Sequence, residues 1–393
     1  MAYPRFPGAT VRRQIPRRLG AEREPVWTLR GPGATHKVRV EVRTAAGITR
    51  YVDEFEGHSW TLQGLRALKR RWTPDAETIT SITGATFAPN GIIGMLTSID
   101  TRGVVIGTSA TPGDFNTTAL IAKIATGTGA GQMTHGAQTF DPALVAIGTT
   151  GTLWESFVQR QFTNGSAGSI TVREVGIYAS TVATDNSTTN RHLILRDVIT
   201  DTVVAPTETI IVRYTFSNAG DPAWNRQSGW WWWFCYSAST GGGGKYRDLT
   251  GTLDSMPGYA GTVAAWATNP EATIGLRAGT GTPAFSQEVT TFFTLPDLYG
   301  IAAAGPSPHS AHVADPIAAD AAGGSYEFSR VIANDSGAPF DVQTVGLIDW
   351  GNSGSVTNAA TSSYLVAGHT YAAPVTLADG EAAEMRCRME LAY

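Results

Sequence analysis

The sequence carries one series of short motifs twice. Each series begins with a Gly-Thr turn and continues with a Val-Gly element that is typical of a strand. Gly107 in the first turn precedes Gly176 in the first Val-Gly element by 69 positions, and Gly279 precedes Gly346 by 67. Two β-domains built on one plan favour a scaffold over a protein with a single catalytic cleft.

A Leu-rich segment continues both series. Leu195 follows Gly176 by 19 positions, and Leu365 follows Gly346 by the same distance. Each series then closes with a strand in which apolar and polar residues alternate. Strict alternation over a whole strand predicts one covered face and one wetter face, as in an antiparallel β-sandwich. The residues predicted to face inward are Ile210, Val212, Tyr214 and Phe216 in the first series and Met385, Cys387, Met389 and Leu391 in the second.

The composition excludes several classes of protein. Gly is frequent, with 44 residues, and charged residues are scarce at 16%, as in short strands joined by many turns. A hydrophobic content of 42% is incompatible with global disorder. The sequence has no apolar run long enough to span a membrane and no signal-peptide pattern at its start. We expect the two cysteines, Cys235 and Cys387, to be reduced and buried rather than part of a disulfide framework.

Charge is distributed unevenly along the chain. Residues 1–72 contain 15 Lys or Arg and 6 Asp or Glu, a balance of +9, so the remainder carries −13 to give the net charge of −4. Residues 1–33 hold five prolines and predict an extended basic arm. This arm is either a solvated tail or a segment that orders on a neighbouring subunit. Its candidate interface residues are Tyr3, Phe6, Arg12, Arg13, Arg17, Arg18 and Trp27.

Residues 34–100 predict a small α+β domain. Alternating valines in Val38–Val42 indicate a half-buried strand, and a turn at Ala45–Gly47 joins it to the next strand as a hairpin. Leucines within Leu62–Trp72 recur at helical spacing. The basic run Lys69–Arg71 lies near the end of this helix, where cations complement the helix dipole, so it need not bind nucleic acid.

Residues 219–272 separate the two series and hold a run of four tryptophans. On a strand, alternation would send two of these side chains to each face. Three interpretations stay open: a central strand buried on both sides, a contact with another subunit, and a platform that stacks on sugars. The glycine run Gly241–Gly244 lacks the pattern of a phosphate-binding loop, because Lys245 is followed by Tyr246. The candidate interface residues of this segment are Trp230, Trp231, Trp232 and Trp233.

The sequence therefore predicts a mainly β protein with two antiparallel, jelly-roll-like β-sandwich modules. A small N-terminal α+β domain and an extended arm precede them. The predicted division is an arm at 1–33, a small domain at 34–100, module 1 at 101–218, a Trp- and Gly-rich insert at 219–272, and module 2 at 273–393.

No constellation of residues indicates catalysis. His309 and His312 lie in a Pro-rich segment with Asp315 nearby, but no third ligand stands at a convincing spacing for a metal. The acidic residues Asp53, Glu54 and Glu56 beside His58 are typical of a solvated turn, because acid–base chemistry needs an apolar setting to separate two pKa values. No Ser-His-Asp order or spacing indicates a triad. We expect neither an enzyme nor a bound cofactor or metal.

Three motifs of the first series, Gly107–Pro112, Thr163–Ala179 and Leu193–Ile199, together resemble a β-module found in virion proteins of tailed bacteriophages. The resemblance implies that a strand pair surrounds the Glu-Val-Gly element and that a final strand follows the Leu-x-x-Arg-Asp segment. The second series departs from this pattern, because Leu365–Ala367 is not followed by Arg-Asp, and Asp349–Trp350 stands where the first series has Ala-Ser. The resemblance implies a structural component of a virion without saying which one.

We therefore expect a structural protein of a tailed-phage virion, assembled in the host cytoplasm. It would form a symmetric homo-oligomer in the tail, baseplate or head–tail neck and dock other virion proteins or fibres. A capsid decoration or head-fibre protein and a receptor protein that binds host carbohydrate are the alternatives. We expect no membrane partner and no nucleic acid, although steeply salt-dependent DNA binding by residues 1–33 would favour the latter.

Overall fold

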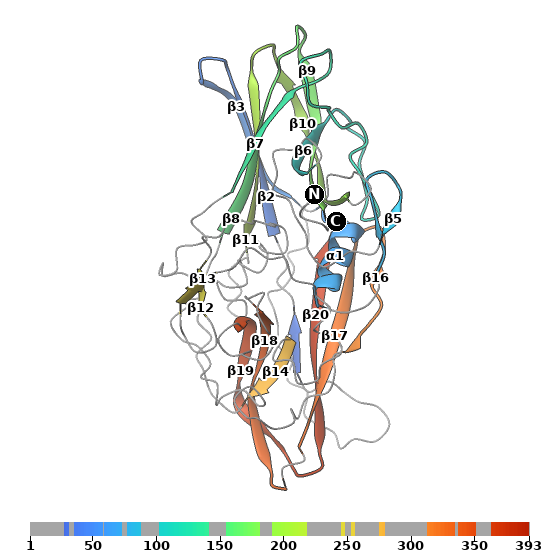
Figure 1. Ribbon diagram of the computed structural model, residues 1–393, viewed down its shortest axis with the longest axis vertical. Coiled ribbons are helices and arrows are strands. Elements are labelled where there is room, and N and C mark those ends of the chain that lie inside the picture. Colours follow the sequence, from blue (N-terminus) through green and yellow to red (C-terminus); the bar gives the residue numbers. More distant parts are fainter. Residues whose placement is uncertain are drawn as a thin grey trace.

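The protein is mainly β, with several antiparallel sheets and, among the described residues, one helix (Figure 1). We call residues 102–217 the first region and residues 275–392 the second region. The computed structural model describes residues 27–30, 35–57, 59–72, 77–87, 102–140, 155–180, 191–217, 245–247, 253–255, 275–279, 313–334, 337–350 and 363–392.

The first region contributes to two antiparallel sheets. One has the order β3-β2-β11-β8-β7, and the other has the order β10-β9-β6. The strands of the five-stranded sheet are β3 (Thr49–Gly57), β2 (Thr35–Arg43), β11 (Thr209–Ser217), β8 (Glu155–Thr163) and β7 (Thr134–Phe140). Those of the three-stranded sheet are β10 (Arg191–Val204), β9 (Ile170–Ser180) and β6 (Gly103–Gly107).

The second region has the corresponding strand orders. One sheet runs β19-β18-β14 and the other β1-β20-β17-β15, with β16 also paired to β17. The strands of the first are β19 (Ser363–Leu377), β18 (Phe340–Trp350) and β14 (Gly275–Gly279). Those of the second are β1 (Trp27–Arg30), β20 (Ala382–Ala392), β17 (Gly323–Ala333), β15 (Val313–Ala314) and β16 (Ala318–Ala319). In chain order and pairing, β6, β8, β9, β10 and β11 thus match β14, β17, β18, β19 and β20.

The strand registers match as well, with one correction to the sequence alignment. A register shift follows Leu193 in β10, which pairs with Tyr178, and another lies beside Leu365 in β19, which pairs with Ile348. Tyr178 and Ile348 each lie two positions after the glycine of their Val-Gly element. The counterpart of Leu365 is therefore Leu193, and the alignment of Leu365 with Leu195 was wrong by two residues.

Buried asparagines stand at matching corners of the two regions. Nδ2 of Asn164, after β8, donates to the carbonyls of Gly168 and Val204 at 2.8 Å each. Nδ2 of Asn334, after β17, donates to the carbonyls of Ala338 and Leu377, also at 2.8 Å each. These bonds hold the turn between two strands to the end of a third strand, where buried carbonyls need a donor.

The turns before the closing strands also match, but with different residues at one position. Thr207 before β11 has φ 68° and Gly380 before β20 has φ 77°, both in the left-handed region. The backbone N–H of each donates to the carbonyl of the matching asparagine, Asn164 or Asn334, at 2.7 Å. Only glycine adopts this conformation without strain, so the first region holds a strained Thr where the second does not.

The alternation predicted for the closing strands is confirmed in β20 as far as its side chains are described, and in part in β11, where Ile211 is buried on the outward side and Phe216 is half-buried. Ile210, Val212 and Tyr214 are fully buried in β11, and Met385 and Cys387 are fully buried in β20. The thiol of Cys387 is free, and burial raises its pKa, so it acts as a small apolar side chain. Cys235 lies outside the described residues.

The segment before the first region joins the same structure. The predicted hairpin is confirmed as β2 and β3, and β2 pairs with β11 in one sheet. The predicted helix is confirmed as α1 (Leu62–Trp72), and its first turn is capped by Thr61, whose Oγ1 accepts from the Gly64 N–H at 3.2 Å. The domain division stays a prediction, although residues 35–57 share a sheet with the first region. Two short ribbons complete the fold: β4 (Ile79–Thr80) with β5 (Thr86–Phe87), and β12 (Lys245–Arg247) with β13 (Leu253–Ser255).

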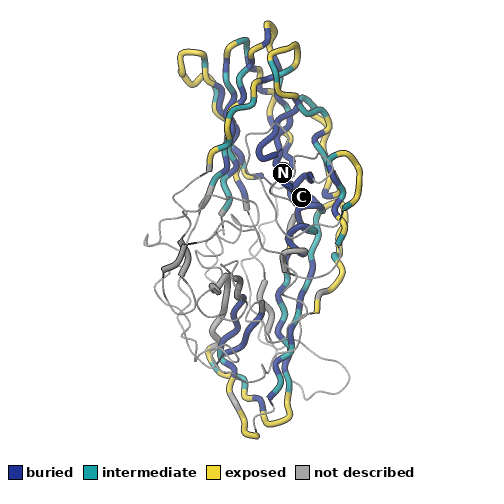
Figure 2. The backbone as a smooth tube through the Cα atoms, viewed as in Figure 1, coloured by how far each residue is buried: buried dark blue, intermediate teal, exposed yellow. Residues whose placement is uncertain are grey.

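The core is continuous across both regions. Most buried apolar residues of the two regions belong to one cluster, and the exposed residues lie in the loops at the two ends and along one side of the molecule (Figure 2). At the junction, the N–H of Phe115 donates to the carbonyl of Ala321 at 3.2 Å. A Cβ at Gly324 in β17 would lie 2.8 Å from Phe115 and 2.9 Å from Leu65, so a glycine is needed for this close approach.

Candidate functional site

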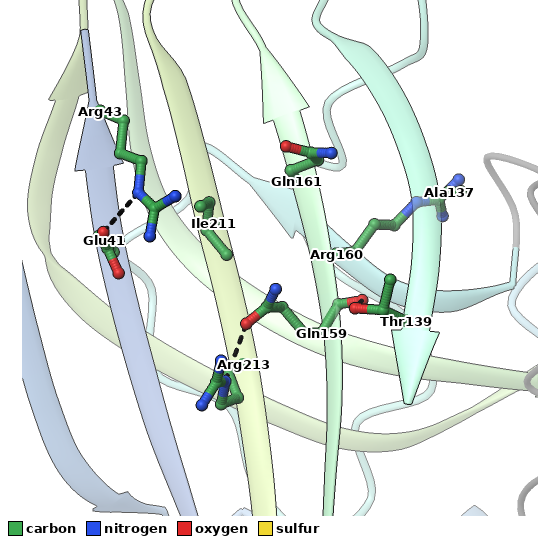
Figure 3. A pocket seen from close by; sticks show the side chains of 9 residues that line it. All are labelled: Glu41, Arg43, Ala137, Thr139, Gln159, Arg160, Gln161, Ile211 and Arg213. Carbon is green, nitrogen blue, oxygen red and sulfur yellow. Dashed lines mark hydrogen bonds and ion pairs between the residues drawn. The ribbon is translucent and has the colours of Figure 1, made fainter. Parts of the chain in front are cut away.

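A polar hollow lies on the outer face of the five-stranded sheet (Figure 3). Its volume is about 170 Å³, and the buried side chain of Ile211 contributes an apolar surface to it. Strands β2, β11, β8 and β7 supply the lining, mostly through outward residues of neighbouring strands that stand side by side; Arg160 is the buried exception. The lining residues are Glu41, Arg43, Ala137, Thr139, Gln159, Arg160, Gln161, Ile211 and Arg213.

Two contacts orient Arg213 at this hollow. Its Nε–H donates to Oε1 of Gln159 at 2.8 Å, across the β11–β8 pair. Its guanidinium carbon lies 4.1 Å from the centre of the Phe157 ring, as in a cation–π contact. Among the described residues, no carboxylate lies within ion-pair distance of Arg213.

Glu41 lies at the other side of the hollow and is already neutralised. The Nε–H of Arg43 donates to Oε1 of Glu41 at 2.6 Å, and the Thr49 hydroxyl donates to the same oxygen at 2.7 Å. The hydrogen bond from Arg43, followed by that from Thr49, holds the pKa of Glu41 below its usual value. Guanidinium and amide N–H groups beside an apolar surface make the hollow suited to bind a small group that carries acceptor oxygens.

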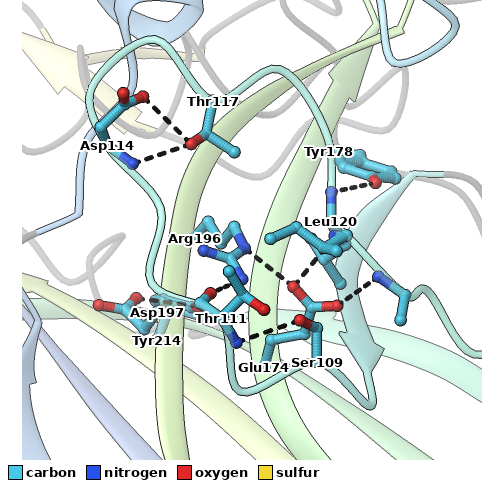
Figure 4. Close-up of polar contacts among 12 residues, drawn as sticks. Ser109, Thr111, Asp114, Thr117, Leu120, Glu174, Tyr178, Arg196, Asp197 and Tyr214 are labelled. Carbon is cyan, nitrogen blue, oxygen red and sulfur yellow. Dashed lines mark hydrogen bonds and ion pairs between the residues drawn. The ribbon is translucent and has the colours of Figure 1, made fainter. Parts of the chain in front are cut away.

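A buried ion pair fixes the loop that follows β6 (Figure 4). Nε–H of Arg196 donates to Oε2 of Glu174 at 2.8 Å, and both side chains are fully buried. Glu174 also accepts the backbone N–H groups of Ile121 and Ala122, at 3.1 and 2.7 Å. Arg196 donates through Nη2 to the carbonyl of Thr111 at 2.7 Å. The pair therefore holds the loop at two points, Thr111 and Ile121–Ala122, against the sheet of β9 and β10.

Tyr178 holds the same loop at a third point. Its hydroxyl oxygen accepts the N–H of Leu120 at 2.9 Å, and burial raises the pKa of Tyr178 to about 12. The phenol is therefore neutral at physiological pH, and its role here is that of a fixed acceptor.

Serine, histidine and aspartate side chains meet in a second buried network, around Asp197. Ser59 donates to Oδ1 of Asp197, the Tyr214 hydroxyl donates to Oδ2 at 3.1 Å, and Nε2 of His36 lies 3.4 Å from Oδ2. Burial raises the pKa of Asp197, but the attraction of His36 and the three hydrogen bonds outweigh it, so the net pKa is lowered. A hydrolytic triad needs His between Ser and Asp, whereas here Asp lies between Ser59 and His36. The network therefore connects β2, β10 and β11 rather than activating a nucleophile.

Most of the candidate residues from the sequence lie outside the described residues. Of the arm, Trp27 begins β1, which pairs in parallel with β20. The acidic group near His58 forms exposed ion pairs, Lys37 with Glu56 at 3.5 Å and Arg39 with Glu54 at 3.5 Å. The candidate residues outside the described part are Tyr3, Phe6, Arg12, Arg13, Arg17, Arg18, Trp230, Trp231, Trp232, Trp233, His309 and His312.

The sequence analysis missed both the hollow and the Asp197 network. Arg196 and Asp197 stand in the Arg-Asp motif that carried the family resemblance, and two adjacent charges within a mostly apolar strand were the available signal. In the described part of the chain, no group of three or more His, Cys, Asp or Glu side chains is placed to hold a metal ion. No helix there has the length and apolar character needed to cross a bilayer.

Comparison with known proteins identified no relative: no family model, curated protein or solved structure matches the chain. Function is therefore argued from the fold and the geometry of these sites.

Proposed function

We propose that this chain is a structural protein of a tailed-phage virion that assembles as a symmetric homo-oligomer in the tail, baseplate or neck. The first and second regions would be two antiparallel, jelly-roll-like β-sandwich modules derived from one duplicated unit. The two modules share one continuous core, and the remaining segments supply contacts with other copies and other virion proteins.

The observation that carries this proposal is the repeated strand order with its repeated buried polar groups. Beside the asparagine corners, a buried arginine occupies matching positions in the two regions. Nη1 of Arg160 in β8 lies 3.3 Å from the carbonyl of Val104 in β6, and Nη1 of Arg330 in β17 lies 3.2 Å from the carbonyl of Leu276 in β14. Such agreement in polar groups that are costly to bury supports common descent better than strand order alone does.

The first strand of the chain supports a role in assembly. β1 belongs to the predicted arm, yet it extends the sheet of the second region by pairing in parallel with β20. An arm segment that adds a strand to a distant sheet edge uses the backbone pairing by which chains join one another. The two buried networks described above fix strands and loops, so assembly rather than turnover is the proposed mechanism.

Sedimentation velocity of the full chain and of a chain lacking residues 1–26 of the arm, which keeps β1, tests this proposal. We expect the full chain to form one closed oligomer and the truncated chain to stay folded but fail to assemble, because the arm supplies contacts between copies. A full chain that stays monomeric at all accessible concentrations would contradict the proposal. Equal oligomer sizes would contradict the role of the arm.

A further inference from the structure

The two regions carry an arginine at the same position of the closing strand, but the neighbours of the two guanidiniums differ. Arg213 on β11 and Arg386 on β20 are matching outward residues, as the register of the flanking strands shows. Arg386 pairs with Glu327 through Nη1 at 3.5 Å and with Glu384 through Nη2 at 3.1 Å. In the second region, two carboxylates therefore neutralise the guanidinium at this position.

In the first region, Phe157 takes the place of Glu327 and Ile211 takes the place of Glu384. Arg39 stands directly across from Arg213 on β2, and like charges in that arrangement repel each other. Among the described residues, the outward guanidiniums of Arg39, Arg43 and Arg213 have two carboxylates within ion-pair distance, Glu41 and Glu54. The hollow therefore has an excess of positive charge centred on Arg213.

The turn Asp379–Glu381 before β20, at the opposite end of the molecule, carries an excess of negative charge. In the first region, Glu208 before β11 receives Nε and Nη2 of Arg50 at 2.8 Å each, a bidentate pair. Its counterpart before β20 is Glu381, which makes the same backbone contact, from the Ala378 N–H at 2.8 Å, and is exposed beside Asp379. Among the described residues, no cation lies within ion-pair distance of Glu381 or Asp379.

We infer that the hollow at Arg213 of one copy binds the Asp379–Glu381 turn of a second copy. The hollow, at about 170 Å³, is smaller than the roughly 300–1,000 Å³ of small-molecule pockets, which suits one or two acidic side chains. Its strands lie in the upper half of Figure 1 and the turn between β19 and β20 at the lower end, so the turn of one copy does not reach the hollow of the same copy. The contact joins unlike surfaces, head to tail, as in a ring.

This inference rests on the proposed homo-oligomer, and charge reversal separates the two. Sedimentation velocity would be run on the full chain, on Arg213→Glu, on Asp379→Arg/Glu381→Arg, and on the chain with all three changes. We expect each charge reversal alone to weaken self-association roughly tenfold or more and the combined variant to recover most of the loss, because opposite charges again face each other. Rising salt should weaken the wild-type association as well.

The exposed pair Arg173 and Asp201, 2.9 Å apart on the first region, supplies matched controls. Arg173→Glu and Asp201→Arg should leave self-association unchanged.

If the Arg213 and Asp379/Glu381 variants assemble like the wild type, the inference fails while the proposed function stands. Weakened association without recovery in the combined variant also overturns the pairing. A monomeric wild type would remove the proposed function itself. Binding of soluble polyuronic acid that is lost in Arg213→Glu, with oligomer size unchanged, would overturn the inference in favour of an acidic glycan.

Discussion

The first and second regions have one strand order but differ in the chemistry placed on it. Glu174 and Arg196 form a buried ion pair in the first region, and the register puts Thr344 and Gly368 at the same positions in the second. The sheet of β19, β18 and β14 therefore does not need such a pair. What the pair adds is the attachment of the loop after β6, which shows that a buried charge here serves a connection rather than the sheet itself.

Removal of one partner of this ion pair should have the largest effect. Arg196→Met should lower the free energy of unfolding by about 3–5 kcal/mol, because the Glu174 carboxylate is left buried without its cation. The double variant Glu174→Gln/Arg196→Met should recover part of this loss. Urea unfolding measures both. A single variant as stable as the wild type would mean that the pair does not anchor the loop.

The asparagine corners should respond alike in the two regions. Asn164→Ala and Asn334→Ala each remove two hydrogen bonds to buried carbonyls, so each should lower the free energy of unfolding by about 2–3 kcal/mol. Urea unfolding of the two variants gives the comparison directly. A large loss in one region and none in the other would break the match between the corners.

Acid should affect the first region before the second. The folded-state pKa of Asp197 is lowered from its ordinary value of 3.8, so its stabilising contribution is present above that value and is lost as the pH falls through the folded pKa. The register places His369 at the matching position of β19, so the second region lacks this carboxylate. Hydrogen exchange between pH 7 and pH 2.5 should show residues 191–217 losing protection before residues 363–392. In Asp197→Asn, residues 191–217 should no longer lose protection before residues 363–392 as the pH falls.

The smallest difference concerns the turn before each closing strand. Thr207→Gly should raise the free energy of unfolding by about 0.5–1 kcal/mol, since it relieves a left-handed β-branched residue at some cost in chain entropy. Gly380→Thr should lower it by about 1–2 kcal/mol for the converse reason. Thermal unfolding resolves shifts of this size. If Gly380→Thr left the free energy of unfolding unchanged, a Thr in the left-handed region would be tolerated in the turn before β20 without strain.

Local patterns predicted the local elements well. The alternation in β11 and β20 and the helical spacing of α1 each arise from one element packing against one apolar surface, so they can be identified in a short window. The alignment of Leu365 failed because residues 193–195 are all apolar. Such a run has no period of two, so the register shift after Leu193 leaves no trace in the sequence.

The sites were less accessible to sequence reasoning because they join distant positions. The Asp197 network draws on His36, Ser59 and Tyr214, which only the folded sheet and the segment before α1 bring together. Similarly, the outward position of Arg213 follows from alternation. Which described residues lie beside it, and that none of them is a carboxylate, depends on the pairing of β11 with β8 and β2.

The pairing of β1 with β20 has a consequence for the time course of folding. Trp27 lies opposite Met385, so one partner leaves the ribosome long before the other. This border of the second region therefore closes late, after a long stretch of chain has been made. Nascent chains growing close together would then compete for the same open border, and a polysome becomes the place where intertwined copies form.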